Sequence, residues 1–209
     1  MRLLYQFPMW LQRCYGNVVW RQEEAASKVA FLTFDDGPVE PVTSEILDIL
    51  VKYGAKVTFF CVGDNIRKYP ATAKRIIDEG HVIGNHTCHH LAGWQTPTDC
   101  YLADVAEADS LMREIGAETG LFRPPYGRMR LSQKAAIAKT HKIVMWDVLT
   151  HDYNPNFTPD RIVKAVQRYT RNGSIINFHD SLKSHDNVIA ALPRCIDFLL
   201  ANGYQLKTL

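Results

Sequence analysis

Short apolar runs alternate along the chain with longer stretches in which apolar residues recur at helical spacing. Runs rich in β-branched and aromatic residues predict seven strands, at 29–34, 56–62, 81–84, 121–123, 142–148, 174–179 and 204–209. Amphipathic stretches predict helices near 43–53, 69–79, 98–116, 132–140, 158–171 and 188–202. This alternation is typical of a parallel sheet connected by helices, so we predict an α/β fold.

Polar side chains gather where the predicted strands end. They are Asp35, Asp36, His86, Arg123, Asp152 and His179. The periodicity allows either a closed (β/α) barrel or an open doubly wound sheet, and in both architectures the carboxyl ends of the strands form the ligand site. We therefore expect these residues to share one site.

Length and charge limit the classes of function. A chain of 209 residues with no linker or repeat is predicted to form one main domain. A formal net charge of +2 does not indicate a nucleic-acid partner. The N-terminal stretch is apolar only in patches and predicts neither a signal peptide nor a transmembrane segment.

The five cysteines are widely spaced, without a CxxC pair, which indicates reduced thiols rather than a disulfide framework. With no recognisable signal peptide, we expect a cytoplasmic location, and association with the cell envelope is the alternative. The sequence does not indicate an oligomeric state.

Residues 33–38 read TFDDGP. Neighbouring strand residues point to opposite faces, so Asp35 and Asp36 should diverge. Asp-Gly-Pro is common turn chemistry, and a plain turn is one interpretation. The other is that the two carboxylates serve one site in different roles, with Gly37 and Pro38 ending the strand.

His86 and His90 are four residues apart in the segment HTCHH. On a helical turn they would project from one face, separated by roughly 40°, and bind a divalent metal ion. A catalytic metal commonly has three protein ligands, so Asp35 or Asp36 would supply the third and the other would act as a base. A solvated loop is the alternative for an isolated HxxxH. Cys88 between them is interpreted as a small buried residue.

Two further residues carry candidate chemistry. Arg123, stiffened by two following prolines, could hold a carboxylate in its ionised form, or lie in a surface turn. His179 ends an apolar strand and could protonate a leaving amine, or be a structural histidine.

In chain order, TFDDGP (33–38), HTxxH (86–90), RPPY (123–126) and a strand ending in HD (179–180) resemble the polysaccharide deacetylases of the NodB-homology type, carbohydrate esterase family four. The resemblance spans about residues 28–209. It implies a distorted (β/α) barrel of about seven parallel strands, similar to a TIM barrel. Residues 1–27 are expected to form an N-terminal extension packed on this catalytic domain.

The resemblance also implies roles. Asp36, His86 and His90 match the metal ligands, for zinc in most members and for cobalt, nickel or manganese in some. Asp35 matches the general base and Arg123 its partner.

Tyr126 matches the residue whose backbone N–H binds the oxyanion, and His179 the general acid. We also expect contacts with substrate from Pro125, Tyr126, Asn177 and Asp152.

The implied activity is metal-dependent hydrolysis of N-acetyl groups on amino sugars of a peptidoglycan- or chitin-like polysaccharide. Mature peptidoglycan lies outside the membrane, in conflict with the expected location. A metal-dependent amidase for a small non-sugar amide and an inactive glycan-binding module are the alternatives.

The chain departs from the family pattern at two places. Leu149 stands where the family has an aspartate that orients the catalytic histidine, and either Asp147 or Asp152 could replace it. Asn177 stands where an apolar residue lines the acetyl pocket, and it could alter acyl selection or bond a neighbouring group.

Overall fold

The computed structural model describes residues 5–8, 12, 15–25, 27–118 and 120–209. Within these residues the centre of the molecule is one nine-stranded sheet. Its strands are β1 (Val18–Val19), β2 (Val29–Asp35), β3 (Thr58–Cys61), β4 (Val82–Asn85), β5 (Leu121–Phe122), β6 (Lys142–Val144), β7 (Val148–Leu149), β8 (Ser174–His179) and β9 (Gln205–Leu206). Their order is β1-β6-β5-β4-β3-β2-β8-β7, with β9 beside the start of β2, and every ladder is parallel.

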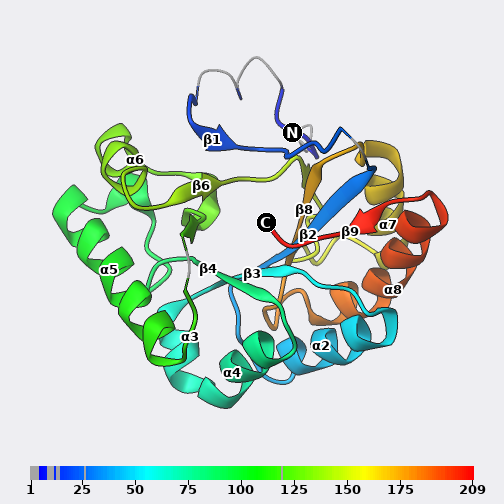
Figure 1. Ribbon diagram of the computed structural model, residues 1–209, viewed down its shortest axis with the longest axis horizontal. Coiled ribbons are helices and arrows are strands. Elements are labelled where there is room, and N and C mark those ends of the chain that lie inside the picture. Colours follow the sequence, from blue (N-terminus) through cyan, green and yellow to red (C-terminus); the bar gives the residue numbers. More distant parts are fainter. Residues whose placement is uncertain (1–4, 9–11, 13–14, 26, 119) are drawn as a thin grey trace.

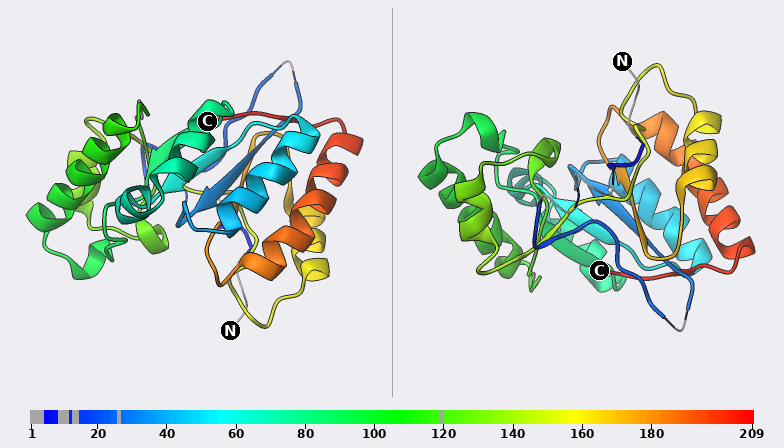
Figure 2. Two further views of the ribbon diagram at one scale, coloured as in Figure 1. Left: turned by 90° about the horizontal axis from the view of Figure 1, so that it is seen from below. Right: turned by 90° about the horizontal axis from the view of Figure 1, so that it is seen from above.

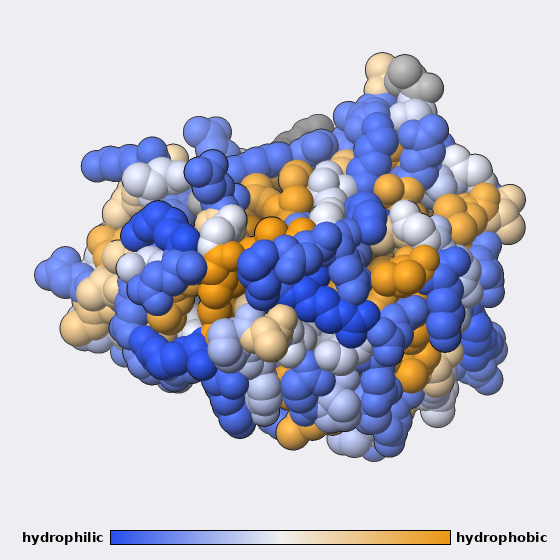
Figure 3. Space-filling view, turned by 60° about the horizontal axis from the view of Figure 1, so that its bottom comes forward, coloured by the Kyte–Doolittle hydropathy of each residue, from blue (hydrophilic) through white to orange (hydrophobic). Residues whose placement is uncertain are grey.

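Helices form an arc around the curled sheet, as Figure 1 shows from one side and Figure 2 from two others. They are α2 (Val42–Tyr53), α3 (Gly63–Lys68), α4 (Pro70–Asp78), α5 (Thr98–Glu114), α6 (Leu131–Ile137), α7 (Pro159–Tyr169) and α8 (His185–Ala201), with 3₁₀ turns η1 (Gly93–Gln95) and η2 (Pro125–Gly127). Hydrophilic side chains dominate the face in Figure 3, and hydrophobic ones show in patches between them. The predicted α/β fold of the distorted-barrel type is confirmed.

Strand β2 explains how the core positions the site. All its residues are buried, as expected of a strand paired on both sides and covered on both faces. Ala30, Leu32 and Phe34 join the core cluster that includes the helices, whereas Val29 and Phe31 belong to the cluster inside the curl of the sheet. Because side chains alternate, Asp35 continues the inner face of the strand.

The predicted strand 142–148 is wrong as a single element. Residues Lys142–Val144 pair with β5 and β1, whereas Val148–Leu149 pair with β8. Between them the chain crosses the seam of the barrel, where Met145 N donates to Val19 O and Asp147 N donates to Ile175 O. The apolar sequence continues through this crossing because both of its ends are buried, so the pattern did not reveal the break.

The N-terminal segment spans the same seam along the side of the molecule that the helices leave open in Figure 1. Strand β1 pairs with β6, and Arg21 then bridges to Ser174 on β8. Tyr5 stacks on Tyr169, with ring centroids 5.3 Å apart. The sequence did not predict strand β1, which is only two residues long.

Four cysteines lie in the described part of the chain, Cys61, Cys88, Cys100 and Cys195, and all are free thiols. Cys14 lies outside the described residues. No described helix combines the length and the apolar character that crossing a membrane requires.

Candidate active site

A cavity of about 690 Å³ opens at the carboxyl ends of the strands. Four of the six polar residues expected at this edge line it, namely Asp35, Asp36, His86 and His179, and the candidate metal ligand His90 lines it with them. The lining also includes Asn65, Lys68, Tyr69, Tyr126, Leu149, Tyr153, Asn177 and Lys183. The structure therefore brings together residues that are up to 144 positions apart in the sequence.

The side chains of Asp35 and Asp36 diverge as predicted, because the two residues have different backbone conformations. Asp35 is the last residue of β2 and points inward along the strand's alternation. Asp36 has a left-handed backbone conformation, with φ at 84°, which is rare for a residue with a Cβ. Asn65 Nδ2 donates to the Asp36 carbonyl at 2.6 Å, which fixes this turn.

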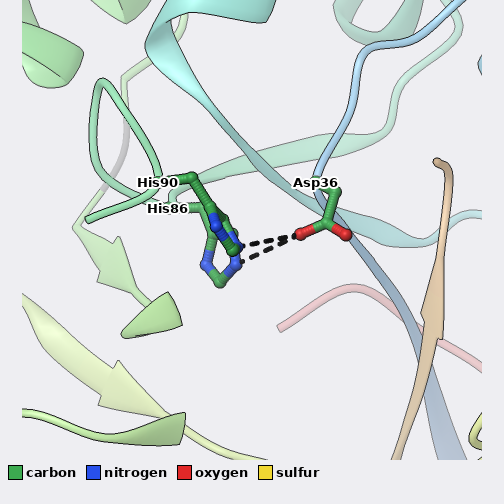
Figure 4. Close-up of side chains that lie close together, drawn as sticks. All are labelled: Asp36, His86 and His90. Carbon is green, nitrogen blue, oxygen red and sulfur yellow. Dashed lines mark ion pairs between the residues drawn. The ribbon is translucent and has the colours of Figure 1, made fainter. Parts of the chain in front are cut away.

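Asp36 faces His86 and His90 (Figure 4). Its Oδ1 lies 3.2 Å from His90 Nε2 and 3.7 Å from His86 Nε2. One ligand atom from each of the three residues lies within 4.8 Å of the others.

The two histidines do not share a helical turn, and that prediction is wrong. His86 follows the end of β4, and the chain then passes through left-handed residues at Thr87 (φ 66°) and His90 (φ 53°). Asn85 Oδ1 accepts from Thr87 N at 2.7 Å and stabilises this loop. Side-chain capping of the tight turn, which spacing does not reveal, brings both rings to one side.

The protonation of the cluster suits metal binding. His86 Nδ1 lies 2.8 Å from the Arg123 carbonyl, to which it donates, so Nε2 presents its lone pair toward Asp36. Burial lowers the pKa of His86 to about 4, which keeps the ring neutral. Burial by itself would raise the pKa of Asp36, but the hydrogen bond with His90 and the neighbouring His179 lower it overall.

Two imidazoles and one carboxylate are a donor set that fits a divalent metal ion of the zinc type. Three protein ligands are the number typical of catalytic zinc sites, whereas structural sites commonly have four.

Asp35 is held separately from this cluster. Arg123 Nη1 donates to its Oδ1 at 2.6 Å, and Asn177 Nδ2 donates to its Oδ2 at 2.9 Å. Arg123 is fully buried, also donates to the carbonyls of Val144 and Met145, and stacks over Phe60 at 4.0 Å. The surface-turn alternative for Arg123 is therefore excluded. Each oxygen of the Asp35 carboxylate thus accepts a hydrogen bond from a different buried side chain, which fixes the orientation of the carboxylate.

Asp152 orients His179. Of the two aspartates that could take the role of the family aspartate replaced here by Leu149, the structure therefore selects Asp152 and not Asp147. His179 Nδ1 lies 2.8 Å from Asp152 Oδ1, and its backbone N donates to Asp152 Oδ2 at 2.7 Å. Asp147 instead pairs with Arg171 at 2.7 Å. Burial lowers the pKa of His179, but the charge and hydrogen bond of Asp152 outweigh it and raise the pKa to about 9.

Of the four residues predicted to contact substrate, two line the cavity and two do not. Tyr126 and Asn177 line the cavity, and Tyr126 is 61% exposed. Asp152 is fully buried behind His179 with both oxygens bonded, and Pro125 is buried outside the cavity lining. For these two residues substrate contact stays a prediction: Pro125 precedes the lining residue Tyr126, and Asp152 holds the lining residue His179.

Asp180 was missed by the sequence reasoning. Its Oδ1 accepts from Gly37 N at 2.8 Å and its Oδ2 from Thr43 Oγ1 at 2.7 Å, which ties the loop after β2 to the end of β8. A Cβ on Gly37 would lie 1.7 Å from this carboxylate, so only glycine fits. Burial raises the pKa of Asp180 to about 7. Its position directly after His179 was the available signal.

Comparisons with known proteins agree with this geometry. The family model described as polysaccharide deacetylase matches residues 22–146. A peptidoglycan-N-acetylglucosamine deacetylase of Bacillus cereus is 31% identical over 197 residues, covering 92% of this chain and 91% of that protein. The peptidoglycan-N-acetylmuramic acid deacetylase of Bacillus subtilis is 32% identical over 87% of this chain and only 38% of its own length.

A solved peptidoglycan N-acetylglucosamine deacetylase superimposes with a TM-score of 0.88 at 31% identity, covering 97% of this chain and 95% of that one. This coverage includes part of the stretch before residue 28, so the likeness begins earlier than the motifs indicated. The sequence, the fold and the site together show that this chain belongs to the polysaccharide deacetylase family.

Proposed function

We propose that this protein is a metal-dependent hydrolase that removes N-acetyl groups from amino sugars of a peptidoglycan-like glycan. One observation carries the proposal: the cluster of Asp36, His86 and His90 lies in the same cavity as a separately paired carboxylate and a histidine–aspartate pair. The named activities of the Bacillus relatives support the choice of substrate.

In this proposal Asp36, His86 and His90 hold the metal ion, with zinc as the proposed ion. When bound there, a divalent cation would supply Lewis-acid polarisation of the amide carbonyl and lower the pKa of water.

Asp35 acts as the general base. Its hydrogen bonds from Arg123 and Asn177 fix its orientation beside the cavity. It accepts a proton from the attacking water, and the proton then leaves through the cavity.

His179 donates a proton to the nitrogen of the departing amine. Its position beside Asp152 keeps it protonated at neutral pH, since its pKa is raised to about 9. The Tyr126 N–H has no acceptor within the described part of the chain and donates to the oxyanion. A well-placed donor of this kind contributes roughly 3 kcal/mol to transition-state stabilisation.

The test measures acetate release from N-acetylglucosamine oligomers, with and without a chelator and a metal add-back. Two matched variants separate the roles of the neighbouring acids. Asp35→Asn is expected to retain the metal and lose turnover, whereas Asp36→Asn is expected to lose the metal itself.

Metal content measured by mass spectrometry and the melting temperature accompany each assay. Equal metal loss in both variants would overturn the division of labour. Glycan binding without acetate release by the metal-loaded wild type would favour a binding module, and neither binding nor release would favour an amidase for small non-sugar amides.

A further inference from the structure

Two lysines are the only charged residues in the cavity lining apart from the aspartates and histidines of the proposed catalytic centre: Lys68 and Lys183. Both are exposed, and neither has an ion-pair partner among the described residues. Elsewhere on the described surface, Lys74 and Lys207 are paired with carboxylates, whereas Lys164 is exposed and has no ion pair, so it is their place in the cavity lining that distinguishes Lys68 and Lys183.

The two lysines lie on either side of the tandem acids. Lys68 ends α3, which follows β3, and Lys183 lies in the loop after β8. Strands β3 and β8 both pair with β2, whose end carries Asp35 and Asp36. The ammonium groups therefore belong to the two loops that flank the proposed catalytic base.

Both lysines are carried by ordered backbone. Lys68 Nζ lies 5.0 Å from the ring centroid of Tyr69, a second lining residue, within the range of a cation–π contact. The turn that bears Lys183 is closed by Ser184, whose Oγ donates to the His179 carbonyl at 2.5 Å. The first contact restrains the Lys68 side chain, and the second restrains the backbone that carries Lys183.

The opposite side of the cavity is aromatic. Tyr126, in the loop after β5, packs its edge on His90 with centroids 4.8 Å apart, and Trp94 lies 5.4 Å beyond it. Aromatic side chains of this kind cover the apolar face of a sugar ring without selecting for charge. The cavity lining thus has the aromatic Tyr126 on the loop after β5, and its two lysines on the loops beside β2.

We infer that Lys68 and Lys183 bind a carboxylate carried by the glycan near the N-acetyl group, so that the preferred substrate is an anionic rather than a neutral amino-sugar polymer. This inference rests on the proposed deacetylase function. The only acids in the cavity lining are Asp35, which Arg123 neutralises, and Asp36, which belongs to the metal cluster. The lysines therefore remain available for an incoming anion, and complementary charge gives specificity.

The experiment compares kcat/KM for acetate release from three glycans of equal length. One is a neutral N-acetylglucosamine oligomer, the second a peptide-free strand that alternates N-acetylglucosamine with N-acetylmuramic acid, and the third the same strand with its lactyl carboxylates converted to carboxamides. A fourth arm, a strand bearing stem peptides, distinguishes a carboxylate on the sugar from one on the peptide.

We expect the carboxylated strand to exceed its carboxamide by about tenfold at low ionic strength, since two exposed ion pairs of ~0.7 kcal/mol each correspond to that factor. Lys68→Gln and Lys183→Gln should each reduce the ratio by about threefold, and the double variant should bring it near one. Lys164→Gln, an exposed lysine on α7 outside the cavity lining, is the matched control.

A ratio near one in the wild type, or an equal decrease in Lys164→Gln, would overturn the inference while acetate release from the neutral oligomer still supports the deacetylase function. Absence of acetate from every glycan would instead remove the proposed function, and this inference with it. Selectivity for the peptide-bearing strand would place the recognised carboxylate on the peptide.

Discussion

Two buried histidines stand at opposite ends of strand β4. His81 directly precedes the strand and His86 directly follows it. Burial lowers the pKa of both to about 4, so both rings are neutral at neutral pH. Their surroundings nevertheless give them opposite tautomers.

The difference comes from one backbone partner each. His81 Nδ1 accepts from Val57 N–H at 3.2 Å, so its proton lies on Nε2, which has no hydrogen-bond partner among the described residues. His86 Nδ1 donates to the Arg123 carbonyl, so its Nε2 is free to donate a lone pair. A perturbed pKa therefore does not by itself identify a functional histidine, whereas the tautomer and the groups facing Nε2 do.

The largest expected effect is the difference between substituting His86 and substituting His81. His86→Gln should lose the metal and reduce deacetylation by at least about 100-fold, because removing a ligand exceeds the effect of removing its supporting partner. His81→Gln should retain the metal and stay within about twofold of wild-type activity. Metal content and acetate release on matched preparations provide the measurement.

Melting temperatures for both variants provide the control for misfolding. Loss of the metal from His81→Gln in a folded protein would contradict the distinction between the two ends of the strand.

The next effect concerns His179, whose protonation depends on a neighbouring carboxylate rather than on a backbone group. Asp152→Asn removes the charge that raises the pKa of His179 to about 9. Because the proposed acid must be protonated, the alkaline limb of the pH profile of kcat/KM should move to lower pH by about 1–3 units.

Asp147→Asn is the matched control, because that aspartate pairs with Arg171 rather than with His179. An unchanged alkaline limb in Asp152→Asn, measured on a folded and metal-loaded protein, would remove the role given to this pair.

The smallest effect is on stability in acid. A histidine whose folded pKa lies below its unfolded value stabilises the fold fully above about pH 6.5, and this contribution is lost as the pH falls toward 4. Protonation of His81 also removes the acceptor for Val57 N–H. Between pH 7 and pH 4.5 the wild type should lose about 2–3 kcal/mol more unfolding free energy than His81→Gln.

Denaturant titrations of the metal-free proteins at both pH values measure this difference. His86 is present in both proteins, so its own titration cancels in the comparison. Equal losses in the two proteins would show that folding does not lower the pKa of His81.

Much of the fold follows from local sequence. Strand β2 has apolar side chains on both faces, which marks it as central, and the glycines at 54 and 80 take the left-handed conformation at the ends of their helices. The split of 142–148 could not be predicted, because residues on the two sides of a barrel seam are equally buried. The pairing of the two-residue β1 is equally non-local.

The sequence by itself determined the residue types of the site, their order and the family they resemble. Tertiary structure decided their relations: Asp152 rather than Asp147 beside His179, Asn177 on Asp35, and the turn that aims His90. Chain spacing constrains only neighbours within a few residues, whereas Asp152 and His179, like Asn177 and Asp35, come from different strands or the loops that follow them and meet at the edge of the sheet. The physical reason is that parallel strands bring their carboxyl ends to one edge, where distant residues share hydrogen bonds and charge.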